Sequence, residues 1–193
     1  MGAPSLPASQ RSQLILVTGP ARSGKSEWAE HLAEQMPKSV VYIATATVST
    51  EDVEWQQRIN RHRCRRPASW QTQEVPRELV RAIREAANGC LLVDSLGTWL
   101  ANQLEQDESS WQACVDELVA ALHQTPCDVI LVAEETGWGI VPAYPSGRTF
   151  RDRLGYLVRR VGAIATHVYL TTGGYALDLT RLGKPLPTRP PLA

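Results

Sequence analysis

Residues 14–30 read LILVTGPARSGKSEWAE, and this stretch determines the fold. Four apolar residues lead into residues 19–26, GPARSGKS, which match the pattern G-x-x-x-x-G-K-[ST] at every fixed position. A helical pattern follows directly. The stretch therefore predicts a buried strand, a phosphate-binding loop and a helix, in that order.

The chemistry of phosphate binding explains this spacing. Gly19 and Gly24 allow the backbone to turn tightly and to present successive N–H groups to a phosphate, backed by the positive end of the helix dipole. Lys25 is predicted to reach the β- and γ-phosphates, and the Ser26 hydroxyl to hold Mg²⁺. The motif predicts that the protein binds a nucleoside triphosphate, but it does not indicate which reaction follows.

Length and composition indicate one domain. The chain has 193 residues, of which 43% are hydrophobic, enough for a single full core. We expect a loose N-terminal leader at 1–12, a nucleotide-binding catalytic domain at 13–175 and a proline-rich C-terminal tail at 176–193.

Net charge, apolar runs and cysteine spacing indicate which partners and which cellular location to expect. Twenty basic and twenty acidic residues cancel, so we expect no nucleic-acid partner. No apolar run approaches the roughly 18 residues of a membrane span, and the N-terminus lacks a signal-peptide pattern. The predicted location is the cytoplasm, where the widely spaced cysteines would be reduced thiols: Cys64, Cys90, Cys114 and Cys127.

Strand and helix patterns alternate along the chain. Apolar, strand-like runs lie at 39–44, 90–94, 128–133 and 167–172, and a short extended piece lies at 70–75. Helical patterns lie at 26–36, from Pro76 onward, and at 95–104, 109–123 and 149–165. This alternation predicts an α/β domain with a mostly parallel central sheet.

Polar residues follow several of the predicted strands, at the edge where α/β proteins bind ligands. A small polar loop, residues 45–50, follows the strand at 39–44. Asp94 ends the next apolar run, and a carboxylate there supports Mg²⁺ in phosphate-loop proteins. Residues 134–142, EETGWGIVP, form either a substrate loop or an ordinary connection.

Residues 58–66, RINRHRCRR, place five arginines around His62. The simpler interpretation is a solvated helix face. The functional interpretation is that the guanidinium groups disfavour the cationic imidazole, which leaves a neutral, nucleophilic ring at pH 7. Such a histidine could accept a nucleotidyl group covalently, while the arginines neutralise phosphates.

These features together resemble a known enzyme family. The motifs are ILVTGPARSGKS at 15–26, YIAT at 42–45, the arginine-rich run with its continuation at 58–74, LLVDS at 91–95, the loop at 135–142 and FRDRLG at 150–155. In this order they resemble the bifunctional adenosylcobinamide kinase / adenosylcobinamide-phosphate guanylyltransferase family, over roughly residues 13–175.

The resemblance implies an activity. Such enzymes phosphorylate adenosylcobinamide with a nucleoside triphosphate, GTP or ATP, and then attach GMP from GTP through a covalent guanylyl-histidine. His62 matches the position of that nucleophile. The resemblance also implies a RecA-like, three-layer P-loop domain and a homotrimer.

The resemblance further implies a set of site residues. The catalytic residues are His62 and Lys25, and the Mg²⁺ ligands are Ser26 and Asp94. The nucleotide contacts are Gly19, Pro20, Ala21, Arg22, Ser23, Gly24, Lys25, Ser26, Thr45, Ala46, Thr47, Arg63, Cys64, Arg65, Arg66, Glu74 and Asp94.

Two other functions fit the phosphate loop. One is a P-loop kinase that acts on another small alcohol, with His62 structural. The other is a nucleotide-dependent switch ATPase or GTPase that acts on a partner protein. Only a nucleotidyltransferase that works through a covalent enzyme would retain the α-phosphate of GTP.

Overall fold

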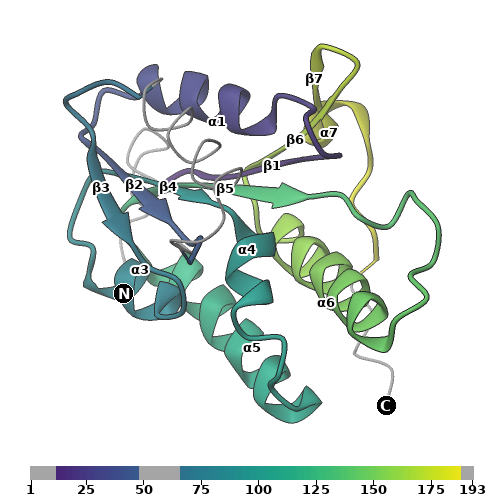
Figure 1. Ribbon diagram of the computed structural model, residues 1–193. Coiled ribbons are helices and arrows are strands. Elements are labelled where there is room, and N and C mark those ends of the chain that lie inside the picture. The colour runs from purple at the N-terminus through teal and green to yellow at the C-terminus, as the bar shows by residue number, and fades with distance from the viewer. Residues whose placement is uncertain (1–11, 48–65, 188–193) are drawn as a thin grey trace, which may run out of the picture.

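The computed structural model describes residues 12–47 and 66–187. They form a seven-stranded sheet in the order β3-β2-β4-β5-β1-β6-β7 (Figure 1). All neighbouring strands are parallel except the antiparallel pair β6 and β7. The strands are β1 (Leu14–Gly19), β2 (Val40–Ala44), β3 (Gln71–Glu74), β4 (Cys90–Asp94), β5 (Asp128–Glu134), β6 (His167–Thr172) and β7 (Tyr175–Asp178).

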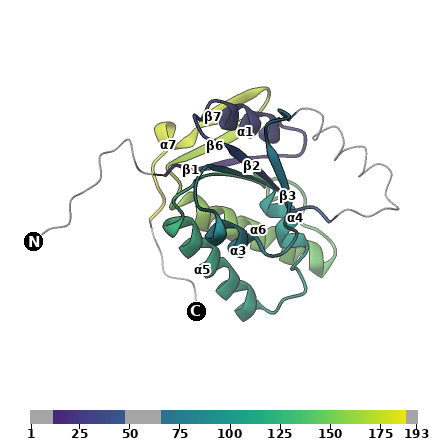
Figure 2. The same cartoon turned by 90° about the vertical axis from the view of Figure 1, so that its left-hand side faces the viewer.

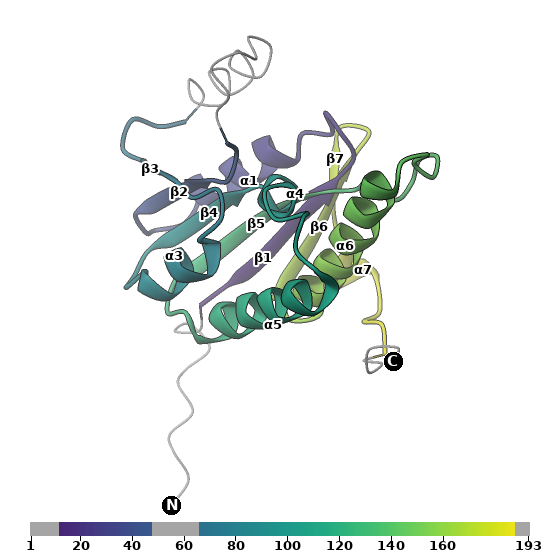
Figure 3. The ribbon, with the colours of Figure 1, turned by 60° about the horizontal axis from the view of Figure 1, so that its bottom comes forward.

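Helices cover both faces of the sheet. The edge-on view in Figure 2 shows α1 (Lys25–Glu34) on one face and the larger helices on the other. Figure 3 shows α5 (Glu108–Gln124) and α6 (Pro145–Gly162) on that second face. The remaining helices are α3 (Leu79–Glu85), α4 (Leu96–Ala101) and α7 (Leu179–Leu182).

The apolar strands alternate between two cores. In β1, Leu14 and Leu16 join the core beneath α3–α6, whereas Ile15 and Val17 join the core beneath α1. β4 and β5 divide their side chains in the same way. Successive side chains of a strand point to opposite faces, so a strand buried on both faces is a continuous apolar run.

The strand order brings the expected site together. β5 lies between β4 and β1, and these three parallel strands end at the same edge of the sheet. The residues at these strand ends are therefore neighbours: Asp94 at the end of β4, Glu135 after β5 and the phosphate loop after β1. This edge corresponds to the ligand-binding edge of open α/β sheets.

The structure confirms the predicted α/β class with a mostly parallel sheet, and corrects some boundaries. α6 begins at Pro145, four residues before the predicted start at 149, because proline is well suited to the first turn of a helix. α4 ends at Ala101 rather than 104. β7 begins at Tyr175, the last residue of the expected domain, and α7 lies in the segment assigned to the tail; neither element was predicted.

Two further observations concern the described part of the chain. None of its helices combines the length and apolar character needed to cross a bilayer. Cys90, Cys114 and Cys127 are free thiols, and burial raises the pKa of Cys90 to about 12. Cys90 is therefore a neutral core residue.

Candidate active site

The loop between β1 and α1 has the backbone that its motif predicts. Gly24, immediately before α1, has φ 87°, and Arg22 has φ 59°. A side chain is disfavoured at such positive φ, which explains a glycine at position 24. Ser26 lies in the first turn of α1, where the backbone N–H groups have no partner within the helix.

Gly19 is required by a close approach of the next strand. A Cβ at this position would lie 2.5 Å from the carbonyl and hydroxyl oxygens of Thr171 and 2.6 Å from Ser23 Oγ. The Ser23 and Thr171 hydroxyls are themselves hydrogen-bonded at 2.8 Å. β6 therefore braces the outer side of the phosphate loop, and Thr171 is a supporting residue that was not predicted.

The Lys25 side chain is buried against the phosphate loop. Its side chain is only 6% exposed, and Nζ lies 3.4 Å from the carbonyl oxygen of Pro20. That contact is long and links the ammonium group to an oxygen of the loop itself. A phosphate in the loop would replace this carbonyl with a charged acceptor, which makes a stronger hydrogen bond.

Asp94 ends β4 and is half-buried. Its Oδ2 accepts a hydrogen bond of 2.9 Å from the Tyr42 hydroxyl. Burial and the neighbouring Asp94 carboxylate raise the pKa of Tyr42 well above its usual value, so the phenol stays a donor. The oxygens of Ser26 and Asp94 suit Mg²⁺, which is usually held by one or two protein oxygens and by substrate phosphates.

A second carboxylate lies one strand closer to the phosphate loop. Glu134 Oε1 accepts a 2.6 Å hydrogen bond from Ser95 Oγ, the N-cap side chain of α4. Burial raises the pKa of Glu134, while the Ser95 bond and nearby Lys25 oppose that rise. Helix α4 approaches this closely because residue 97 is glycine: a Cβ there would collide with Glu134 Oε2.

Residues 135–144 form a loop whose two ends are fixed. Glu135 Oε1 accepts a 2.8 Å hydrogen bond from Thr18 Oγ1, and Glu135 N donates to Gly19 O at 2.9 Å. At the far end, Arg148 Nη1 donates to the carbonyls of residues 142 and 143 at 3.1 and 2.8 Å. Between these ends the exposed apolar side chains are Trp138, Ile140, Val141 and Tyr144, at 62, 94, 57 and 77%.

The loop after β2 is organised by a residue that sequence reasoning missed. Asn102 Nδ2 donates to Thr45 O at 2.8 Å, and Asn102 Oδ1 accepts from Thr47 Oγ1 at 3.0 Å. Thr45 itself is fully buried, and its hydroxyl bonds to the backbone N–H and C=O of Ser95. Ala46 and Thr47 are the more accessible members of this predicted contact set.

Arg66 and Glu74 flank the other edge of the site. The Arg66 guanidinium carbon lies 3.3 Å from the centre of the Tyr42 ring, and Nη1 lies 3.5 Å from Thr72 Oγ1. Glu74 is exposed at the end of β3, opposite Ala44 in the register. The predicted residues His62, Arg63, Cys64 and Arg65 lie outside the described residues.

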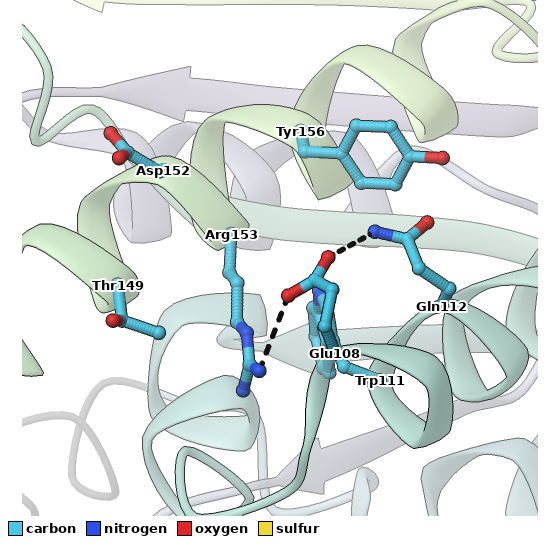
Figure 4. Close-up of a pocket in the computed structure, with 7 residues that line it drawn as sticks. All are labelled: Glu108, Trp111, Gln112, Thr149, Asp152, Arg153 and Tyr156. Atoms are coloured by element: carbon cyan, nitrogen blue, oxygen red, sulfur yellow. Dashed lines mark hydrogen bonds and ion pairs between the residues drawn. The ribbon is translucent and has the colours of Figure 1, made fainter. Parts of the chain in front are cut away.

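A pocket of about 320 Å³ lies between α5 and α6, away from these residues (Figure 4). The buried Arg153 donates to the carbonyls of Leu104 and Gln106 and to the Glu108 carboxylate, so it ties α6 to the segment before α5. The pocket contains no predicted site residue. It is lined by Glu108, Trp111, Gln112, Thr149, Asp152, Arg153 and Tyr156.

The phosphate loop and parallel sheet define a P-loop nucleotide-binding protein of the RecA-like α/β class. Residues 15–179 match the model of the family described as cobinamide kinase / cobinamide phosphate guanyltransferase. The chain belongs to this family, and the resemblance seen in the sequence is confirmed.

The chain matches two curated relatives over almost their entire length. The chain is 40% identical over 174 residues to the bifunctional adenosylcobalamin biosynthesis protein CobP of Pseudomonas aeruginosa, which covers 89% of this chain and 98% of that protein. It is 38% identical over 182 residues to the bifunctional adenosylcobalamin biosynthesis protein CobU of Salmonella typhimurium, covering 86% and 99%.

Solved structures show the fold alone. A protein from a structural study of Pyrococcus horikoshii OT3 has a TM-score of 0.55 at 6% identity, covering 89% of this chain and 88% of that one. A prototypical ATPase of the type III secretion system of pathogenic bacteria has a TM-score of 0.51 at 10% identity, covering 89% and 58%.

Proposed function

We propose that this chain phosphorylates adenosylcobinamide and then transfers GMP from GTP to adenosylcobinamide phosphate. The observation that carries the proposal is the phosphate loop, with Lys25 and Asp94 at one sheet edge, in a member of the cobinamide kinase / cobinamide phosphate guanyltransferase family. The donor is GTP, with ATP as a second phosphoryl donor. We further propose that the protein acts in the cytoplasm as a homotrimer.

The phosphate loop serves both reactions by positioning and by charge. Backbone N–H groups at the start of α1 and the ammonium of Lys25 would bind the phosphates. Mg²⁺, held by Ser26 and Asp94, would supply positive charge to the same oxygens when bound. Because charge spreads onto phosphate oxygens during transfer, groups fixed before the reaction stabilise it most effectively.

His62 is proposed as the nucleophile of the guanylyl transfer. A neutral imidazole nitrogen attacks the α-phosphorus of GTP, an N–P bond forms, and the P–O bond to pyrophosphate breaks. An oxygen of adenosylcobinamide phosphate then attacks the same phosphorus and displaces the imidazole. Arg63, Cys64, Arg65, Arg66 and Glu74 are proposed as nucleotide contacts around it.

The loop at 135–144 is proposed to hold the corrinoid. It leaves β5, the strand between the Asp94 strand and the phosphate-loop strand, so its first residue lies beside the phosphate loop. Its exposed aromatic and aliphatic side chains suit the apolar face of a macrocycle whose reacting hydroxyl must reach those phosphates.

Intact-mass spectrometry tests the guanylyl transfer. After incubation with GTP and Mg²⁺, we expect the protein to gain one guanylyl group, which is lost in acid and is chased onto adenosylcobinamide phosphate. Phosphorylation of adenosylcobinamide without any protein label would instead support a kinase with a structural His62. GTP turnover that needs no corrinoid would support a nucleotide-dependent switch.

Trp138→Ala tests the corrinoid loop. Truncating an exposed aromatic anchor removes the surface for the macrocycle, so we expect KM for adenosylcobinamide to rise about 10-fold. The rate of guanylyl labelling without corrinoid should stay at the parent value. Tyr175→Ala, at a residue 76% exposed in β7, is the matched control and should change neither quantity. An unchanged KM in Trp138→Ala would place the corrinoid elsewhere.

A further inference from the structure

We propose that Tyr42 is a positioning residue that holds two residues of the candidate site, Asp94 and Arg66, through one side chain. Its hydroxyl orients Asp94, and its ring supports Arg66, the residue that directly follows the His62 segment. The inference rests on the proposed function and assigns to Tyr42 a role in that same site.

The sheet register explains how Tyr42 reaches Asp94. β2 and β4 are parallel neighbours in which Tyr42 lies opposite Leu92 and Ala44 lies opposite Asp94. Tyr42 and Asp94 are thus diagonal neighbours on one face of the sheet, a separation that a long aromatic side chain can span. The 2.9 Å hydrogen bond to Oδ2 fixes the carboxylate and leaves Oδ1 for the metal.

The ring of the same tyrosine contacts Arg66, which precedes β3 in the chain. Tyr42 lies opposite Thr72 of β3 in the register, and Arg66 contacts both members of this pair. Its guanidinium group lies over the ring at 3.3 Å, the arrangement of a cation–π contact. Arg66 is therefore held against the sheet, on the strand next to that of Asp94.

Tyr42 is 3% exposed and packs in the core under α1, so a purely structural role is the alternative. That role requires an apolar ring and nothing more. It does not explain a buried hydroxyl aimed at the carboxylate of the metal site, or a guanidinium group held against the ring. The two contacts use different parts of the side chain, and separate substitutions can therefore distinguish them.

Tyr42→Phe removes the hydroxyl and keeps the ring. Outer-sphere hydrogen bonds to metal ligands typically affect metal affinity about 10- to 100-fold. We expect the Mg²⁺ concentration for half-maximal binding of a fluorescent GTP analogue to rise about 10-fold, with guanylyl labelling at saturating Mg²⁺ unchanged. Tyr169→Phe, a partly buried tyrosine of β6, is the matched control and should leave both quantities at the parent value.

Tyr42→Leu removes both contacts and keeps an apolar residue. We expect the same Mg²⁺ shift and, in addition, guanylyl labelling about 10- to 100-fold slower at saturating Mg²⁺, because Arg66, a proposed nucleotide contact, loses the ring that holds it in position. Arg66→Met alone should slow labelling without the Mg²⁺ shift. Combining Arg66→Met with Tyr42→Leu should slow labelling little further, since each change already removes the contact between Arg66 and the Tyr42 ring.

The outcomes separate this inference from the proposed function. If the parent protein acquires no guanylyl group, the proposed function fails, while the Mg²⁺ titration still tests the link between Tyr42 and Asp94. If the parent is labelled but Tyr42→Phe leaves the Mg²⁺ dependence unchanged, the tyrosine is only core packing. Fully additive effects of Tyr42→Leu and Arg66→Met would equally overturn the inference.

Discussion

Lys25→Met should remove both activities. Lys25 is only 6% exposed, and its ammonium group contacts the loop that is proposed to hold phosphates, so its loss leaves their charge without a fixed counterion. Removing one pre-positioned donor from a transition state typically costs about 100- to 1,000-fold in rate. We expect losses of that size in corrinoid phosphorylation and in guanylyl labelling, measured with γ- and α-labelled GTP.

The chain supplies a matched control for this substitution. Lys184 is an exposed lysine outside the site, and Lys184→Met removes the same charge from the surface. It should leave both rates within a factor of about two, because exposed charges contribute little. Parent-like rates in Lys25→Met would mean that residues 19–26 do not bind the reacting phosphates.

His62→Ala should separate the two activities. Without the imidazole no covalent guanylyl-enzyme can form, so labelling by α-labelled GTP and the transfer of GMP should both be abolished. Corrinoid phosphorylation should persist at a measurable rate, because Lys25 and Asp94 are unchanged. The measurement is the acid-labile α-label on the protein, together with the rate of phosphorylated product.

His123→Ala serves as the control for that experiment, since His123 is exposed in the last turn of α5. It should retain full labelling. Guanylyl transfer at the parent rate by His62→Ala would exclude the covalent route through this residue and would support a simpler P-loop kinase.

The sequence was most informative where function depends on adjacent residues. The phosphate loop is a continuous motif, so its strand, its glycines, Lys25 and Ser26 could all be predicted from residues 14–30. Asp94 was recognisable because it ends an apolar run downstream of that motif. Strands buried on both faces are equally clear, since their apolar runs carry no competing pattern.

The contacts that position the site were not predictable in this way. Tyr42 meets Asp94 only because β2 is placed beside β4, and strand order is not encoded in any local pattern. Asn102 holds Thr45 from the C-cap of α4, 57 residues further along the sequence. β7 was missed because a four-residue strand with exposed side chains has little apolar periodicity, and it forms by pairing with β6.

The glycine at position 97 constrains how the sequence can vary. A side chain there would collide with the Glu134 carboxylate and displace it from its hydrogen bond with Ser95 Oγ. The observed position of the Glu134 carboxylate therefore requires a glycine 37 residues earlier in the chain. We expect chains that carry a bulkier residue at position 97 to have a shorter or neutral one at position 134, so that the two positions vary together.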